Sequence, residues 1–349
     1  MTRFLVGARL GIFVVTAAFV AAAPATAQTP PGGRLTVVSG GCSVVTDQVA
    51  QTNLYYAPCN GRTVPVYDGT SVVSLDFTSG LNDTVGLTLA LAGSASWAPN
   101  TLYDAFVTAS RDLCTGPAYA DSGAGTSARA ATGGLAIAAG YPTNASNGMT
   151  CRTGASTTVS CATNQCTYVG TVLTGASAGT IDLKFGTNAT NCGKAILSVY
   201  NAYNQKAVRA SVSDSVQNWT YTAATWRPAH GQTNCSIDVV AGQSTDVFSA
   251  KYLQRVNPVA GGAYGAITLG LNGYATIAAR AFSALFQCVG GTTACTEVLV
   301  ATMDDNLAPG LNTIYAMEQS DSYHANVFNG QNSAGGIMQQ QMLSYTGAM

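Results

Sequence analysis

Short runs in which apolar and polar residues alternate recur along the chain. Residues 85–91, 208–212 and 267–271 are the clearest, because an apolar residue stands at every second position. Side chains of a β-strand alternate between the two faces of its sheet, so these runs predict strands with one buried face. Turn dipeptides such as Asn60-Gly61 and Asn272-Gly273 separate the runs. The pattern predicts an all-β fold of β-sandwich or barrel-like modules.

One segment also has the spacing of a helix. Within residues 274–286, Ile277, Ala281 and Leu285 stand four positions apart, which places side chains on one face of an α-helix. A buried strand fits the same residues, so we expect at most one short helix in the chain. The C-terminal segment 335–349 carries few charges and is expected to pair as a closing strand.

The composition agrees with an all-β fold and excludes one class of partner. Hydrophobic residues make up 47% of the 349 residues and charged residues only 9%. Glutamate and lysine, two good helix formers, are scarce, and Glu297 and Glu318 are the only glutamates. The sequence has no basic patch, so a nucleic-acid partner is not expected.

The N-terminus has the pattern of a secretory signal peptide. Arg3 and Arg9 precede the apolar run at residues 10–23, and Ala25-Thr26-Ala27 is a small-x-small cleavage site. The apolar run is too short for a membrane-spanning helix. We therefore expect a signal peptide at 1–27 and a secreted protein, periplasmic, at the cell surface or extracellular, with no membrane span after cleavage.

Three further segments are expected after the signal peptide. The Pro- and Gly-rich residues 28–33 predict a flexible leader, and residues 34–228 a first β-rich domain. Residues 229–349 form either a second β-rich domain or a continuation of the first. The boundary is placed after Arg227-Pro228, where an aromatic segment gives way to a polar one.

Ten cysteines follow residue 27, in the part of the chain that would enter an oxidising compartment. No Cys-x-x-Cys pattern occurs, so structural disulfides are predicted and neither a metal nor another cofactor is expected. Ten cysteines allow many pairings. Loop length favours two local pairs, namely Cys161 with Cys166 and Cys288 with Cys295.

Several different short motifs that contain aromatic residues follow one another over more than half of the chain. They are residues 52–56, 66–69, 102–106, 168–171, 200–204 and 219–222 followed by 225–227. In this order the chain resembles uncharacterised phage and prophage virion proteins of the tail-fibre kind. The resemblance implies a β-rich structural or receptor-binding protein that forms oligomers.

Residues with catalytic potential do not form a convincing constellation. Residues 175–179 match the Gly-x-Ser-x-Gly nucleophile elbow around Ser177, but strand-like runs lie on both sides of it, where the motif requires a helix after the serine. His230 and His324 stand in no zinc-binding or triad pattern, and Asp304-Asp305 is expected in a solvated turn. The sequence therefore predicts a protein without catalytic residues.

The aromatic segment before residue 228 suggests a binding surface. Trp226, Trp219 and Tyr221 are candidate ligand-binding residues, because exposed aromatic rings can stack on sugar faces. The alternative is that these rings pack in the core.

Three hypotheses follow for the function. The leading one is a secreted structural or adhesive, receptor-binding protein of tail-fibre type that forms homo-oligomers. The second is a carbohydrate-binding protein that recognises surface glycans by aromatic stacking. The third is a secreted hydrolase using Ser177 or a pair of aspartates.

Overall fold

The computed structural model describes residues 30–131, 133–138, 140–144, 148–244, 247–289, 295–330 and 341–349. The predicted signal peptide lies outside these residues. Apart from one 3-10 turn, Ala229–Gly231, the regular elements of the described part are β-strands. The prediction of an all-β fold is confirmed. No helix long and apolar enough to cross a membrane occurs among the residues described.

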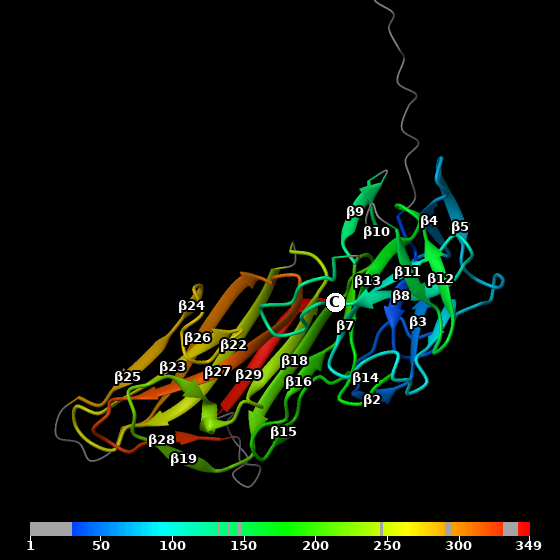
Figure 1. Cartoon of the computed structure of the whole chain (residues 1–349). Coiled ribbons are helices and arrows are strands. Elements are labelled where there is room, and N and C mark those ends of the chain that lie inside the picture. The colour runs from blue at the N-terminus through cyan, green and yellow to red at the C-terminus, as the bar shows by residue number, and fades with distance from the viewer. Residues whose placement is uncertain are drawn as a thin grey trace, which may run out of the picture.

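The strands form two lobes (Figure 1). The first lobe contains a large antiparallel sheet, in the order β12 (Thr158–Cys161), β11 (Met149–Arg152), β8 (Leu113–Ala118), β7 (Leu102–Val107), β13 (Thr167–Leu173), β10 (Tyr141–Asn144), β9 (Leu135–Ala138), with β17 (Val199–Asn201) on β13. Three small sheets accompany it: β1 (Arg34–Thr36), β3 (Asn53–Ala57) and β6 (Leu87–Ala90); β2 (Gln48–Gln51) and β14 (Ile181–Leu183); β4 (Thr63–Tyr67) and β5 (Val72–Asp76).

The second lobe is a sandwich of two sheets, which we call the outer and the inner sheet. The outer sheet has the order β15 (Asn188–Ala189), β18 (Ala207–Asp214), β29 (Gln341–Ala348), β22 (Val247–Asn257), β26 (Glu297–Asn306), β24 (Ala281–Phe282), and also holds β19 (Asn218–Tyr221) and β28 (Asn326–Asn329). The inner sheet has the order β16 (Ala195–Leu197), β21 (Ser236–Ala241), β27 (Gly310–Ser320), β23 (Tyr264–Leu271), β25 (Ala284–Gln287), with β20 (Arg227–Pro228) on β27.

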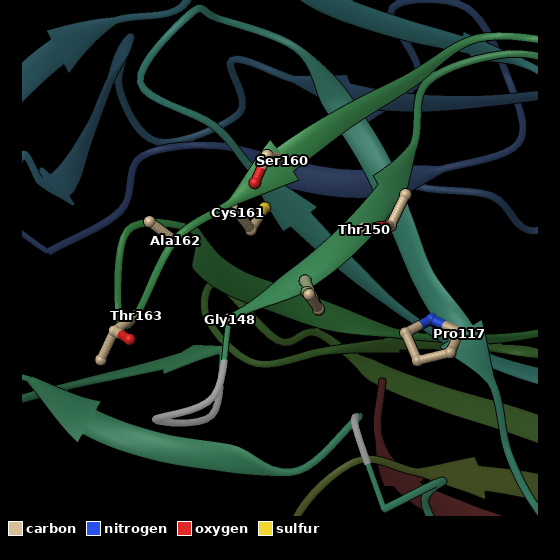
Figure 2. A pocket seen from close by; sticks show the side chains of 8 residues that line it. Pro117, Gly148, Thr150, Ser160, Cys161, Ala162 and Thr163 are labelled. Carbon is tan, nitrogen blue, oxygen red and sulfur yellow. The ribbon is translucent and has the colours of Figure 1, made fainter.

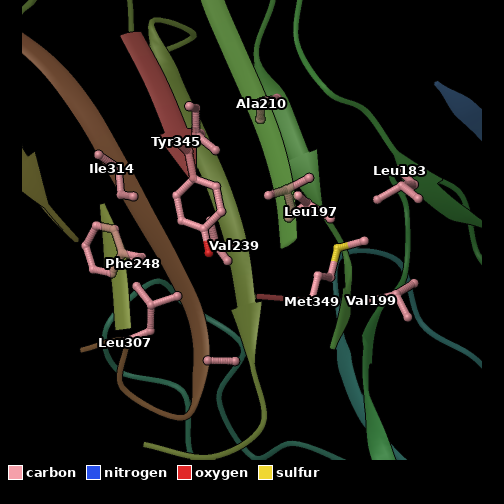
Figure 3. Close-up of a cluster of buried hydrophobic side chains, with 14 of the residues drawn as sticks. Leu183, Leu197, Val199, Ala210, Val239, Phe248, Leu307, Ile314, Tyr345 and Met349 are labelled. Atoms are coloured by element: carbon pink, nitrogen blue, oxygen red, sulfur yellow. The ribbon is translucent and has the colours of Figure 1, made fainter. Parts of the chain in front are cut away.

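Alternation along the sequence decides which face of each strand is buried. Phe248, Ala250 and Tyr252 of β22 are buried, whereas the residues between them are exposed. Their buried side chains contribute to a hydrophobic cluster that also contains Ile314 of β27. Figure 3 shows Phe248, Ile314 and Tyr345 of this cluster close together. The two sheets of the second lobe therefore bury their apolar faces against each other, as in other sandwiches.

The sheets do not divide at the expected domain boundary of residue 228. Strands β16 and β18, which precede it, pair with β21 and β29 of the second lobe. The same hydrophobic cluster contains Leu35 of the first lobe and Ile314 of the second. Residues 34–228 and 229–349 thus share sheets and core.

The structure decides two local expectations. Of the two alternatives for residues 274–286 it has strands and no α-helix: the chain forms β24 in one sheet, crosses at Ser283 and forms β25 in the other. The leader predicted at 28–33 is not flexible throughout, because Pro31, Gly32 and Gly33 are buried and the Gly32 N–H donates to the Thr63 carbonyl at 2.8 Å. The predicted closing strand is present as β29, which pairs with β18 and β22, while residues 335–340 lie outside the described ranges.

Five disulfides hold the fold together. The two local pairs predicted from loop length, Cys161–Cys166 and Cys288–Cys295, are both present. The other three join more distant segments, as Cys42–Cys59, Cys114–Cys151 and Cys192–Cys235. The clustered cysteine sulfurs all belong to these bonds, so they are not available as metal ligands.

Candidate functional site

The core of the second lobe contains a fully buried carboxylate. Glu318 of β27 accepts hydrogen bonds from Trp219 Nε1 at 3.0 and 2.8 Å. Arg227 Nη2 lies 2.6 Å from Glu318 Oε1, and the backbone N–H of His230 donates to the same oxygen at 3.2 Å. Burial raises the pKa of Glu318, and the charge of Arg227 opposes this shift. The carboxylate thus connects β27 to residues 219–230.

A second buried carboxylate lies next to this group. Asp214 Oδ2 is 2.8 Å from His230 Nδ1, and the His230 ring stacks on Trp219 with 4.6 Å between ring centroids. The backbone N–H of Asp214 donates to Gln341 Oε1 at 2.6 Å. His230 therefore bridges Asp214 and Glu318, and the cluster connects β18, β19, β27 and β29.

An Asp–His pair can activate a nucleophile only if a hydroxyl or thiol reaches the other ring nitrogen. In the described part of the chain, no hydrogen bond joins a hydroxyl to His230, and both Asp214 and Glu318 are buried. A substrate cannot contact carboxylates that are closed off from solvent. The geometry supports a structural role for the cluster.

The other candidates for catalysis lie apart. Ser177 is exposed in the turn between β13 and β14 of the first lobe, where its carbonyl accepts a bond from Thr180. His324 lies in the second lobe with its Nδ1 2.6 Å from Asp321 Oδ2. Burial raises the pKa of Asp321, but bonds from His324 and from backbone N–H groups outweigh it and leave this pKa below its usual value. Ser177 and the two histidines therefore do not meet in a triad.

The three aromatic candidates do not form one exposed platform. Trp219 is 7% exposed, and its N–H is bonded to Glu318. Tyr221 is half-buried, with the Arg227 guanidinium 3.7 Å from its ring centroid. Trp226 is half-buried. Of the two alternatives, core packing describes Trp219.

An exposed apolar surface lies on the outer sheet of the second lobe, which sequence reasoning did not identify. Val300, Leu253 and Met342 stand directly opposite one another across β26, β22 and β29, so their side chains share one face. Phe282 of β24 and Val298 of β26 flank this row. Phe282 is 75% exposed and Val300 is 42% exposed. We call these five residues the apolar face.

The apolar face borders a free strand edge. β24 pairs with β26 only at Met303 and Thr302, so among the described strands residues 297–301 pair on one side alone. The sequence contains a signal for this surface in the run Val298-Leu299-Val300-Ala301, in which every residue is apolar. Such a run is typical of strands buried on both faces, yet only Leu299 and Ala301 are buried.

Comparisons with known proteins do not assign the chain. No family model and no curated protein matches it. Among solved structures, dimeric latent PorU from Porphyromonas gingivalis aligns with 41% of this chain at 9% identity and a TM-score of 0.25. The chain covers only 13% of that protein. A likeness at this level carries no argument about function.

Proposed function

We propose that the chain is a secreted, non-enzymatic structural or adhesive protein that works as a homo-oligomer, as the resemblance to tail-fibre-type proteins implies. The five disulfides favour an oxidising compartment. The observation that carries the proposal is the apolar face beside a free strand edge, because contiguous exposed apolar surface marks contact sites.

The occupant that fits this surface best is a second copy of the chain. A free edge pairs readily with another free edge, and a two-fold arrangement places the same residues on both sides. Antiparallel pairing centred on Leu299 would set Val298 of one copy opposite Val300 of the other. None of the five side chains of the apolar face carries a charge. The nearest charges on this face are Lys251 and Arg255 of β22, one strand away from the free edge of β26.

The test is the mass of the oxidised mature protein in solution, measured by size-exclusion chromatography with light scattering. We expect a dimer or larger assembly for the native chain and a monomer for Val300→Lys, because two lysines would be buried close together. Leu285→Lys is the matched control, since Leu285 is 59% exposed on β25 of the other sheet. A native monomer, or equal dissociation in the control, would contradict the proposal.

A further inference from the structure

A groove opens in the first lobe where two neighbouring strands diverge. β8 and β11 share a single paired position, Thr115 with Arg152. Beyond it β8 continues with Gly116 and Pro117, and a proline has no N–H to donate to a neighbouring strand. Two hollows of about 610 and 310 Å³ lie there, and Pro117 and Thr150 line both. Figure 2 shows the larger one, with Pro117 on one strand and Thr150 and Ser160 on the β11–β12 hairpin.

Covalent bonds hold the groove in shape. The Cys114–Cys151 disulfide joins β8 to β11 at the paired end. The Cys161–Cys166 disulfide ties the end of β12 to the segment that leads into β13. β11 and β12 are paired at four consecutive positions. A site that is already formed loses little conformational entropy when a ligand binds.

The lining of the groove is rich in hydroxyl groups and contains one charge. The hydroxyl-bearing residues are Ser96, Tyr103, Thr115, Thr150, Thr158, Ser160 and Thr163. The hydroxyls of Tyr103 and Thr115 already accept bonds from Ala98 and Trp97. No carboxylate lines either hollow, and Arg152 is the only cationic residue in them. Pro117 and Met149 add apolar surface.

Arg152 is positioned but not neutralised. Its Cζ atom lies 5.8 Å from the centroid of the Trp97 ring, and Nη1 donates to the Ala155 carbonyl at 3.3 Å. Arg152 forms no ion pair within the described residues. A guanidinium has five N–H donors in a planar fork, so most of them remain for a ligand.

We propose that this groove binds an oligosaccharide that carries carboxylate groups, that is, one built of uronic acids. Side-chain hydroxyls donate and accept hydrogen bonds, which matches the hydroxyls of a sugar. The Arg152 fork matches the two oxygens of a carboxylate. Pro117 can cover the C–H face of a sugar ring.

Calorimetric titration of the full mature chain with tetragalacturonate, and with its neutral methyl ester, tests the proposal. Arg152→Gln is expected to weaken binding of the acid about tenfold and to leave binding of the ester unchanged. Thr150→Val removes a hydroxyl at nearly constant volume and is expected to weaken both. Arg209→Gln is the matched control, because Arg209 is exposed on β18 of the second lobe and should change neither.

Three outcomes would overturn the proposal. The native chain binds neither saccharide, Arg152→Gln binds the acid as tightly as the native chain does, or the groove binds an extended polar peptide in place of the saccharide. The result is independent of self-association, because Val300→Lys leaves the first lobe intact and should bind the acid as the native chain does. A failure here therefore leaves the proposed oligomer untouched, and the reverse also holds.

Discussion

At the scale of single residues, Glu318 fixes the position of a whole segment of the second lobe. It is one of two glutamates in the sequence, and it accepts bonds from Trp219, Arg227 and the backbone of His230. Buried charges are tolerated only when they are paired and hydrogen-bonded. The bonds to Glu318 keep residues 219–230 against β27, although Trp219 and Glu318 are 99 positions apart.

Replacing this carboxylate should therefore cost stability. Glu318→Gln keeps the size of the side chain but removes its charge and turns an N–H₂ donor toward other donors. We expect the free energy of unfolding to fall by about 2–3 kcal/mol, measured by urea denaturation with tryptophan fluorescence. The same change at the exposed Glu297 should cost less than about 0.5 kcal/mol. Equal losses in the two variants would contradict a special role for Glu318.

The sequence could indicate residue types at this scale but not their partners. The sequence indicates Trp219, Tyr221 and Trp226 as binding candidates because aromatic rings suit a sugar surface. What the sequence cannot show is that Glu318 lies beside the Trp219 N–H. That contact depends on how β19 and β27 are brought together by the rest of the fold.

At the scale of elements, residues 274–286 show why periodicity alone misleads. Ile277 and Leu285 have helical spacing, yet both are exposed in the structure. β24 bonds to β26 and β25 bonds to β23, so pairing with distant strands overrides the local preference. The clean alternation at 208–212 and 267–271, by contrast, correctly predicts the strands β18 and β23. One face is buried along 207–212 of β18, as predicted, whereas β23 is buried on both faces.

Gly170 is a position where one strand cannot accept a side chain. The pairing of β13 with β7 shifts register between Tyr168 and Gly170. A Cβ atom at Gly170 would lie 2.0 Å from the Tyr200 carbonyl oxygen on β17, far inside van der Waals contact. β13 and β17 can approach this closely only because residue 170 is glycine.

Gly170→Ala should lower the free energy of unfolding by on the order of 3 kcal/mol, because β17 must move to relieve the overlap. Urea denaturation measures this loss. In Gly273→Ala the new methyl group meets nothing within 4 Å, and we expect a change of less than about 1 kcal/mol. If Gly170→Ala were as stable as Gly273→Ala, the close approach of β13 and β17 would not be a requirement of the fold.

At the scale of the whole molecule, Arg129 forms a buried ion pair in the first lobe and also bonds to the second lobe. Arg129 Nε lies 2.6 Å from Asp104 Oδ2 on β7, and Arg129 Nη2 donates to the Gly242 carbonyl of the second lobe at 2.9 Å. Asp104 is 3% exposed and also accepts bonds from Tyr119 and Thr171. Burial is the largest single effect and lowers the pKa of Arg129. The charge of Asp104, its hydrogen bond and the nearby tyrosines together outweigh burial, so the net shift of this pKa is upward.

The sequence predicted the class of molecule better than its division into parts. Scarce charge, alternating strands and ten cysteines indicate a disulfide-linked β-protein because each is a local or compositional property. The lobes could not be located in the same way, since β18 pairs with β29 across more than a third of the chain. The aromatic-to-polar change at residue 228 therefore does not mark where the sheets separate.

Arg129→Met tests whether the ion pair fixes the lobes to each other. Methionine retains much of the apolar stem, but Asp104 is left buried without its cation, which should lower the free energy of unfolding by about 3–5 kcal/mol. Because Arg129 also bonds to Gly242 of the second lobe, small-angle scattering should show a larger radius of gyration, and a protease should cut near residue 129 faster. Arg209→Met, at an exposed arginine of β18, should change neither the radius of gyration nor the rate of cleavage. A variant that loses stability with unchanged scattering would mean that the shared hydrophobic core, which includes Leu35 and Ile314, holds the lobes together without the ion pair.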